Sequence, residues 1–299
     1  MPNAMSELRT KWLSCYCDVV IFFMLVFVNG WLGFPEYGVI GAALGNGLSF
    51  VIGALLLIVF WLSNQLSVKY STIFDLDLDR VKEIFKVGLP AALEQVIFQI
   101  GITAFLILVA YYGTEAYAAY GIGVQILSFS FVIGFGFSIA GATLVGQHLG
   151  AKNKNQAKRA GWGAMRLSIV SMTFFGVIIA TFAEPLARFM IDNDEVVRLT
   201  VIFIWLLGSM QPLMAIEFSL GGALRGAGDT KTPLAITLTC LLFIRVFLAV
   251  IFFLLDASIE IIFSTLLADY IVKGFLYVSR FRSDKWMNVL KIKEVDQQP

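Results

Sequence analysis

The stretch GLPAALEQVIFQ, residues 88–99, decides how the rest of the chain is interpreted. It opens an apolar run that continues to about residue 110, which is long enough to cross a bilayer as a helix. Carrying a charged group into hydrocarbon costs roughly 2.5–3.5 kcal/mol on insertion scales. Glu94 is therefore expected to face protein or water and to bind a cation or substrate. The alternative is a buried, protonated Glu94 that only hydrogen-bonds a neighbouring helix.

The composition is that of a membrane protein. The 299 residues are 59% hydrophobic and 14% charged, with a mean hydropathy of +0.83. A soluble domain would carry about 25% charged residues. The net charge of +1 gives no indication of a nucleic-acid partner. Apolar runs of about 20 residues recur along the chain, and in lipid such runs must be helical because every backbone group has to be satisfied internally.

We predict an all-α polytopic membrane protein with about eight transmembrane helices. They are expected at residues 16–33, 38–61, 88–112, 119–146, 161–183, 197–221, 233–255 and 259–278. Short cytoplasmic loops collect Lys and Arg. The loops on one side hold Arg9, Lys11, Lys69, Arg80, Lys82, Lys86, Lys152, Lys154, Lys158, Arg159, Arg225, Lys231, Arg280, Arg282, Lys285, Lys291 and Lys293, whereas the opposite loops hold only Arg188 and Arg198. Both termini are therefore expected to be cytoplasmic.

Residues 63–87 form a longer loop in which charged and apolar residues alternate. Apolar residues at 78, 81 and 85 have helical spacing, which predicts a short amphipathic helix at the membrane interface. Such a segment commonly joins two bundles of a transporter, and the loop is therefore the predicted domain boundary.

Polar side chains inside the predicted spans are the candidate binding residues. Gln95, Gln99 and Thr103 recur every four residues and form a stripe, with Glu94 beside it. Glu217 lies in another span. Two carboxylates in separate helices can share a bound cation, or hold a proton whose release is linked to a cationic substrate. Glu94, Gln95, Gln99 and Glu217 are therefore the predicted cation and substrate site.

Other charged residues are assigned to simpler roles. Asp269 and Lys273 are four residues apart on the last span, which predicts an intrahelical ion pair of structural importance. Arg225 and Asp229 can pair at the cytoplasmic mouth as a breakable gate. A structural turn anchored by a positive charge is the simpler interpretation of that loop. His148, the only histidine, has no second ligand at metal spacing, so no metal site is expected.

Three motifs carry a family resemblance. They are GLP at residue 88, LVGQHLGA at residues 144–151 and GALRGAGDTKTP at residues 222–233. In this order and spacing they resemble the multidrug and toxic compound extrusion (MATE) family of cation-coupled exporters, over about residues 10–286. The stretch GFPEYGVIGAAL, residues 33–44, is similar to the family's turn between its fifth and sixth helices.

The resemblance implies a twelve-helix fold in two six-helix lobes, of which this chain supplies a part. Residues 1–62 would be the last two helices of a truncated N-lobe, 63–87 a cytoplasmic linker, 88–280 the six-helix C-lobe and 281–299 a cytoplasmic tail. The family's aspartate on its first helix has no counterpart here. Members exchange a drug-like cation for H⁺ or Na⁺ across the plasma membrane, which implies a coupling ion and no cofactor.

The expected function is secondary active export of organic cations or other amphiphilic small molecules by a protein embedded in the lipid bilayer. One alternative is a lipid-linked saccharide flippase of the same superfamily, which predicts a cavity rich in Arg and Lys. A second alternative is a non-transporting remnant, because the first helices of the family are missing. An enzyme is not expected, since no catalytic residues at nucleophile–base spacing occur.

Overall fold

The computed structural model describes residues 22, 26, 27, 38–62 and 78–289, and every regular element among them is a helix. The chain divides into two compact units, Met1–Leu76 and Asp77–Pro299. In the first unit, α2 (Gly38–Leu62) is a 25-residue helix at the predicted second span. Most of the predicted first span, and residues 63–77 of the predicted linker, lie outside the described residues.

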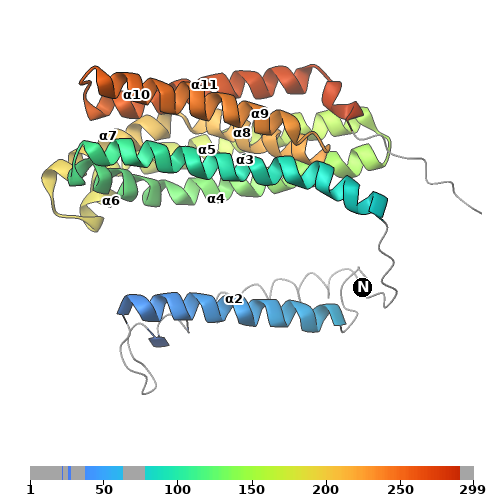
Figure 1. The fold of residues 1–299 in the computed structure, drawn as a ribbon, viewed down its shortest axis with the longest axis horizontal. Helices are drawn as coiled ribbons and strands as arrows, with labels where there is room; N and C mark the ends of the chain where they lie inside the picture. The colour runs from blue at the N-terminus through green and yellow to red at the C-terminus, as the bar shows by residue number, and fades with distance from the viewer. Residues whose placement is uncertain (1–21, 23–25, 28–37, 63–77, 290–299) are drawn as a thin grey trace, which may run out of the picture. The chain divides into compact units, whose positions relative to one another are not determined.

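The second unit is a bundle of helices that run roughly along one direction (Figure 1). Its long helices have the predicted apolar character, and five of them, at residues 84–111, 114–150, 154–181, 231–254 and 259–282, are long and apolar enough to cross a membrane. The elements are α3 (Leu78–Tyr111), α4 (Thr114–Gly150), α5 (Lys154–Thr181), α6 (Ala183–Met190), α7 (Asp194–Ser209), α8 (Gln211–Gly226), α9 (Lys231–Leu238), η2 (Thr239–Val246), α10 (Phe247–Leu254), α11 (Ile259–Arg282) and η3 (Lys285–Asn288). The prediction of an all-α polytopic membrane protein is confirmed.

The predicted span at residues 197–221 is not one straight helix. It consists of α7 and α8, which meet at an angle of 54°. The break falls at Met210, just before Pro212 in the first turn of α8. A proline has no N–H to donate and crowds the preceding turn, so the chain bends where the helix hydrogen bonds are interrupted. Ser130 of α4 donates a hydrogen bond of 2.6 Å to the side-chain oxygen of Gln211 at this bend.

The first and last long helices of the second unit are longer than the predicted spans. α3 begins at Leu78, so residues 78–87 of the predicted linker are the first turns of a spanning helix. At the other end, α11 continues to Arg282 and η3 follows it. Trp286 of η3 is fully buried and stacks on Phe281 with ring centroids 4.6 Å apart. The described part of the predicted tail therefore packs into the lobe.

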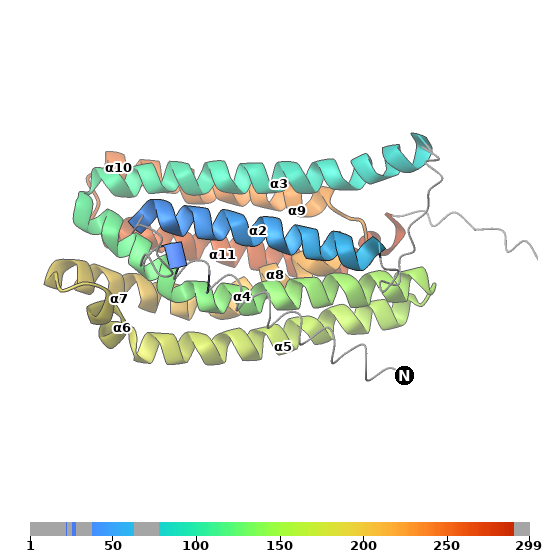
Figure 2. The ribbon, with the colours of Figure 1, turned by 90° about the horizontal axis from the view of Figure 1, so that it is seen from below.

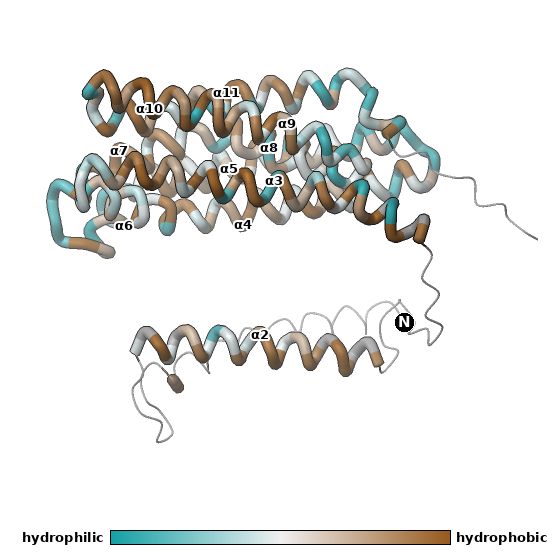
Figure 3. The backbone as a smooth tube through the Cα atoms, in the orientation of Figure 1, coloured by the Kyte–Doolittle hydropathy of each residue, from teal (hydrophilic) through white to brown (hydrophobic). Residues whose placement is uncertain are grey.

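Hydrophobic residues cover most of the length of the bundle, whereas hydrophilic residues collect at its two ends (Figure 3). This distribution matches a protein whose middle section is solvated by lipid. α3 and α5 lie at opposite edges of the second unit (Figure 2). The interior between them is built largely by α4 and α8, which form the most extensive helix pair of the described residues.

Small residues allow α4 and α8 to approach closely. A Cβ atom added to Gly222 would meet the backbone carbonyl of Ser138, and one added to Gly226 would meet the backbone of Ala142. Lipid tails are as apolar as leucine, so helices in a membrane associate through such close packing rather than through a hydrophobic driving force. These two glycines set the distance between the two central helices.

Gly222→Ala is expected to lower the free energy of unfolding by about 1–3 kcal/mol, because the added methyl group overpacks the contact with Ser138. Gly136→Ala is the matched control on α4, where an added Cβ meets no atom within 4 Å. It should leave stability unchanged or raise it, since alanine favours the helix more than glycine does. Thermal unfolding of the purified protein in detergent measures both variants, and equal melting temperatures would contradict the close packing of α4 and α8.

Candidate functional site

Glu94 of α3 is paired with a basic side chain from another helix. Its Oε1 atom accepts a hydrogen bond of 2.9 Å from Nη1 of Arg225, at the end of α8. The same oxygen accepts one of 3.4 Å from the hydroxyl of Thr237 in α9. The Glu94 side chain is only 13% exposed, so the ion pair is largely shielded from solvent. The predicted site carboxylate thus connects three helices near the basic end of the lobe.

Asp229, in the loop between α8 and α9, is paired with Arg280 of α11. Its Oδ2 atom accepts hydrogen bonds of 2.9 Å and 2.6 Å from Nε and Nη2 of that arginine. Asp229 also accepts hydrogen bonds from the hydroxyl and the N–H of Thr232, in the first turn of α9. The loop changes direction at Gly228, whose φ of 78° is accessible to glycine.

The predicted contact between Arg225 and Asp229 is therefore replaced by two other pairs. Arg225 lies in the last turn of α8 and faces α3, whereas the turn at Gly228 directs Asp229 towards α11. A contact between these two residues was one of the two interpretations of this loop, beside a structural turn. The tertiary structure instead offers each of them a partner on a different helix, and both pairs lie at the same end of the lobe.

Glu217 of α8 belongs to a second cluster, buried deeper in the lobe. Lys273 of α11 places its Nζ atom 3.4 Å from Oε1 of Glu217 and 3.2 Å from Oδ2 of Asp269. Lys273 and Asp269 are fully buried, and the Glu217 side chain is 19% exposed. The predicted intrahelical pair between Asp269 and Lys273 is confirmed. No local pattern indicated that Glu217 would join this pair, because the contact connects separate helices.

Arg245 adds a second buried cation near this cluster. It lies in η2, a π-helical segment in the middle of the α9–α10 span. Its side chain is 5% exposed, and its guanidinium lies 5.2 Å from the ring centroid of Phe105 in α3. An aromatic face stabilises a cation that has left water. The eight-residue π-helical segment thus places a charged side chain in the apolar interior of the lobe.

The polar stripe of α3 does not take part in the charged cluster at Glu94 or in the one at Glu217. The Gln95 and Gln99 side chains are exposed on the second unit. Thr103, which continues the stripe, donates its hydroxyl to the backbone carbonyl of Gln99 at 2.9 Å. The structure thus brings Glu94 together with Arg225, and Glu217 together with Lys273, but leaves the two predicted amides without contact to the carboxylates.

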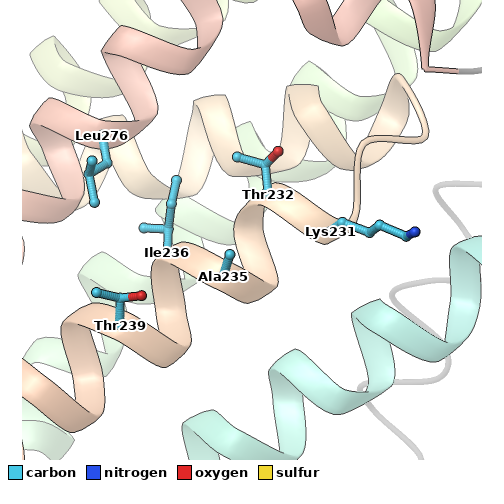
Figure 4. Close-up of a pocket in the computed structure, with 6 residues that line it drawn as sticks. All are labelled: Lys231, Thr232, Ala235, Ile236, Thr239 and Leu276. Atoms are coloured by element: carbon cyan, nitrogen blue, oxygen red, sulfur yellow. The ribbon is translucent and has the colours of Figure 1, made fainter.

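A groove of about 420 Å³ lies between α11 and the segment formed by α9 and η2. Its lining residues are Lys231, Thr232, Ala235, Ile236, Thr239 and Leu276, none of which was predicted as a site residue. Figure 4 shows the side chains of α9 and of Thr239 in η2 along one helical segment, and Leu276 facing them from α11. Within residues 38–62 and 78–289, no group of three or more His, Cys, Asp or Glu side chains is arranged to hold a metal ion.

Comparison with known proteins gives a consistent result. The MatE family model matches residues 90–251. A protein of Thermotoga maritima named "Probable multidrug resistance protein NorM" is 33% identical over 287 residues, covering 93% of this chain and 59% of that protein. The "Uncharacterized transporter YisQ" of Bacillus subtilis is 24% identical, with 88% of this chain and 58% of that protein covered.

Solved structures share the fold. A MOP superfamily transporter from Pyrococcus furiosus superimposes with a TM-score of 0.81 at 20% identity, over 90% of this chain and 60% of that one. A MATE crystal structure in the straight conformation gives a TM-score of 0.78 at 19% identity, over 90% of this chain and 61% of that one. The present chain thus spans about 60% of the length of these relatives.

Lys273→Met is expected to lower the free energy of unfolding by about 3–5 kcal/mol, because it leaves the carboxylates of Glu217 and Asp269 buried without their cation. Lys231→Met is the matched control, since this lysine is exposed. Thermal unfolding in detergent compares the two. A Lys273→Met protein as stable as the control would show that the cluster does not depend on the ammonium group.

Proposed function

This chain belongs to the multidrug and toxic compound extrusion (MATE) family, and we propose that it forms the larger part of a secondary active antiporter that exports organic cations in exchange for H⁺ or Na⁺. The single observation that carries the proposal is the pairing of Glu94 with Arg225, across α3 and α8. A partly shielded carboxylate held by a basic partner can exchange that partner for a proton, a sodium ion or a cationic substrate.

The exchange requires two states that differ in affinity for the coupling ion. In the described state the carboxylate of Glu94 is held by Arg225, and that of Glu217 by Lys273. Protonation or Na⁺ binding at Glu94 weakens its pair with Arg225 and frees α3 from α8. A cationic substrate that reaches the same carboxylate displaces the coupling ion, which links the two fluxes.

The proposed cytoplasmic gate consists of two ion pairs at the same end of the lobe. One is Glu94 with Arg225, and the other is Asp229 with Arg280. Together they connect the α8–α9 loop to α11, and α8 to α3. Conformational switches of this kind act by making and breaking interface ion pairs. When the lobe opens towards the cytoplasm, the pairs Glu94–Arg225 and Asp229–Arg280 break. All four residues belong to this lobe.

The proposed location is the plasma membrane, with both termini cytoplasmic. The described basic residues support this orientation, because one end of the lobe carries Lys152, Lys154, Lys158, Arg159, Arg225, Lys231, Arg280, Arg282 and Lys285. At the other end, Arg188 pairs with Glu184 and Asp194, and Arg198 pairs with Glu195 and Glu260. The excess of Lys and Arg on one side is the pattern of cytoplasmic loops.

The antiporter proposal is favoured over the flippase alternative by the charge of the interior. A saccharide flippase calls for a cavity rich in Arg and Lys. Among the described residues of the deep interior, Arg245 lies against an aromatic ring, and the ammonium of Lys273 is shared by two carboxylates. Each of these two cations thus already has a partner within the lobe.

Ethidium uptake into everted membrane vesicles, driven by an imposed H⁺ or Na⁺ gradient, tests the function. Glu94→Gln is expected to reduce the gradient-dependent rate about tenfold, which corresponds to roughly 1.4 kcal/mol. Glu115→Gln is the matched control, because this exposed glutamate lies at the opposite end of the lobe. An unchanged rate and an unchanged pH or Na⁺ dependence in Glu94→Gln would remove the coupling role.

The same assay decides between a transporter and a non-transporting remnant. The 299-residue chain is compared with a fusion that adds the part of the Thermotoga maritima relative that the match does not cover. Uptake by the fusion alone would show that the lobe is competent but needs the added part. Absence of uptake from both proteins would favour the remnant.

A further inference from the structure

One face of α5 carries five exposed residues and the half-buried Gly163. Arg159, Gly163, Arg166, Val170, Phe174 and Val177 recur at intervals of three or four residues, so they lie within one narrow stripe of the helix. The residues on the opposite side are buried in the lobe, namely Ala157, Gly161, Ala164, Ser168, Met172, Gly176 and Ile179. The stripe therefore faces outwards along the edge of the bundle that α5 forms (Figure 2).

The two arginines of this stripe lack a protein partner. Neither Arg159 nor Arg166 forms an ion pair or a side-chain hydrogen bond with another residue in the described part of the chain. α5 contains no acidic residue, and Glu115, the one acidic residue of α4, lies at the far end of that helix. The neighbouring Lys158 instead reaches Asp284 at 2.7 Å on another side of α5.

The depth of the arginines indicates which partner they require. A bilayer core of about 30 Å needs about 20 helical residues. Counted back from Thr181, the last residue of α5, this core ends at about residue 162. Arg166 then lies about 6 Å inside the hydrocarbon and Arg159 about 4.5 Å outside it, at 1.5 Å per residue. Long basic side chains reach from the membrane core towards the interface, so the guanidinium group of Arg166 is expected near the level of the lipid phosphates, where Arg159 already lies.

The space between the arginines is open. Gly163 lies midway between them, and a Cβ atom added there would meet no atom within 4 Å. Beyond Arg166 the stripe becomes apolar, with Val170 69%, Phe174 61% and Val177 58% exposed. Two cations followed by a row of exposed apolar side chains match the chemistry of a phospholipid, which has an anionic headgroup and an extended acyl chain.

We propose that this face of α5 binds an anionic phospholipid, with the phosphate held by Arg159 and Arg166 over Gly163 and one acyl chain lying along Val170, Phe174 and Val177. The guanidinium group is suited to phosphate because its planar fork donates two parallel hydrogen bonds. In the proposed orientation the bound lipid belongs to the cytoplasmic leaflet. The lipid site does not depend on the antiporter proposal, since it involves neither Glu94 nor Glu217.

Native mass spectrometry of the full 299-residue chain in detergent tests this site. The protein is equilibrated with equal amounts of phosphatidylglycerol and phosphatidylcholine that carry the same acyl chains, and the retained lipids are counted. Each basic residue near an anionic lipid surface contributes about 1 kcal/mol, or about fivefold in affinity. Arg159→Gln and Arg166→Gln should each lower the preference for phosphatidylglycerol about fivefold, and the double variant about 25-fold.

Two controls make the result specific. Arg282→Gln removes the same charge from an exposed arginine on α11 and should retain the preference. The Arg159→Lys/Arg166→Lys variant keeps both charges and should lose less than about fivefold. Soluble glycerophosphate should not displace the lipid, because it has no acyl chain to lie along the row of exposed apolar side chains.

Several outcomes would overturn the proposal. They are equal retention of both lipids by the unaltered chain, a double Gln variant that behaves like Arg282→Gln, and displacement of phosphatidylglycerol by glycerophosphate. A double Gln variant that changes the oligomeric state instead of lipid retention would assign the face to a second copy of the chain.

Discussion

Lys273 lies fully buried in the lobe, with its ammonium between Asp269 on its own helix and Glu217 on α8. Each charge alone would be expensive in this environment, and removing one partner of a buried pair commonly costs several kcal/mol. The cluster therefore constrains α8 and α11 to remain together in one register. The same rule holds nearer the basic end, where Glu94 pairs with Arg225 and Asp229 with Arg280. Each carboxylate that the spans of the lobe bury has a basic partner.

The packing of the central helices follows from size rather than from charge. Gly222 and Gly226 bring α8 against Ser138 and Ala142 of α4, and this close approach leaves no room for a side chain between the two helices. The bend ahead of Pro212 then directs α7 away from the line of α8. Charged clusters and close glycine contacts thus share α8, and a rearrangement of this helix in transport would affect both.

The sequence was informative wherever the deciding interaction was local. Helical length and apolarity predicted the spans, because a chain in lipid must satisfy its own backbone groups. The four-residue spacing of Asp269 and Lys273 predicted their ion pair, because that spacing places two side chains on one side of a helix. The spacing of Arg225 and Asp229 is also four residues, but these two side chains do not pair with each other. A turn at Gly228 lies between them, and each pairs with a residue on another helix.

By itself, the sequence determined the class of protein, the approximate spans, the family resemblance and the identity of the carboxylates that enter the membrane. Only the tertiary structure decided which cations Glu94 and Glu217 meet. Glu94 and Arg225 are separated by 131 positions in the chain, and nothing in the local pattern of either helix specifies their contact. The physical reason is that a buried carboxylate is unstable without a counter-charge. Which basic residue supplies that charge depends on how α3, α8, α9 and α11 pack against one another.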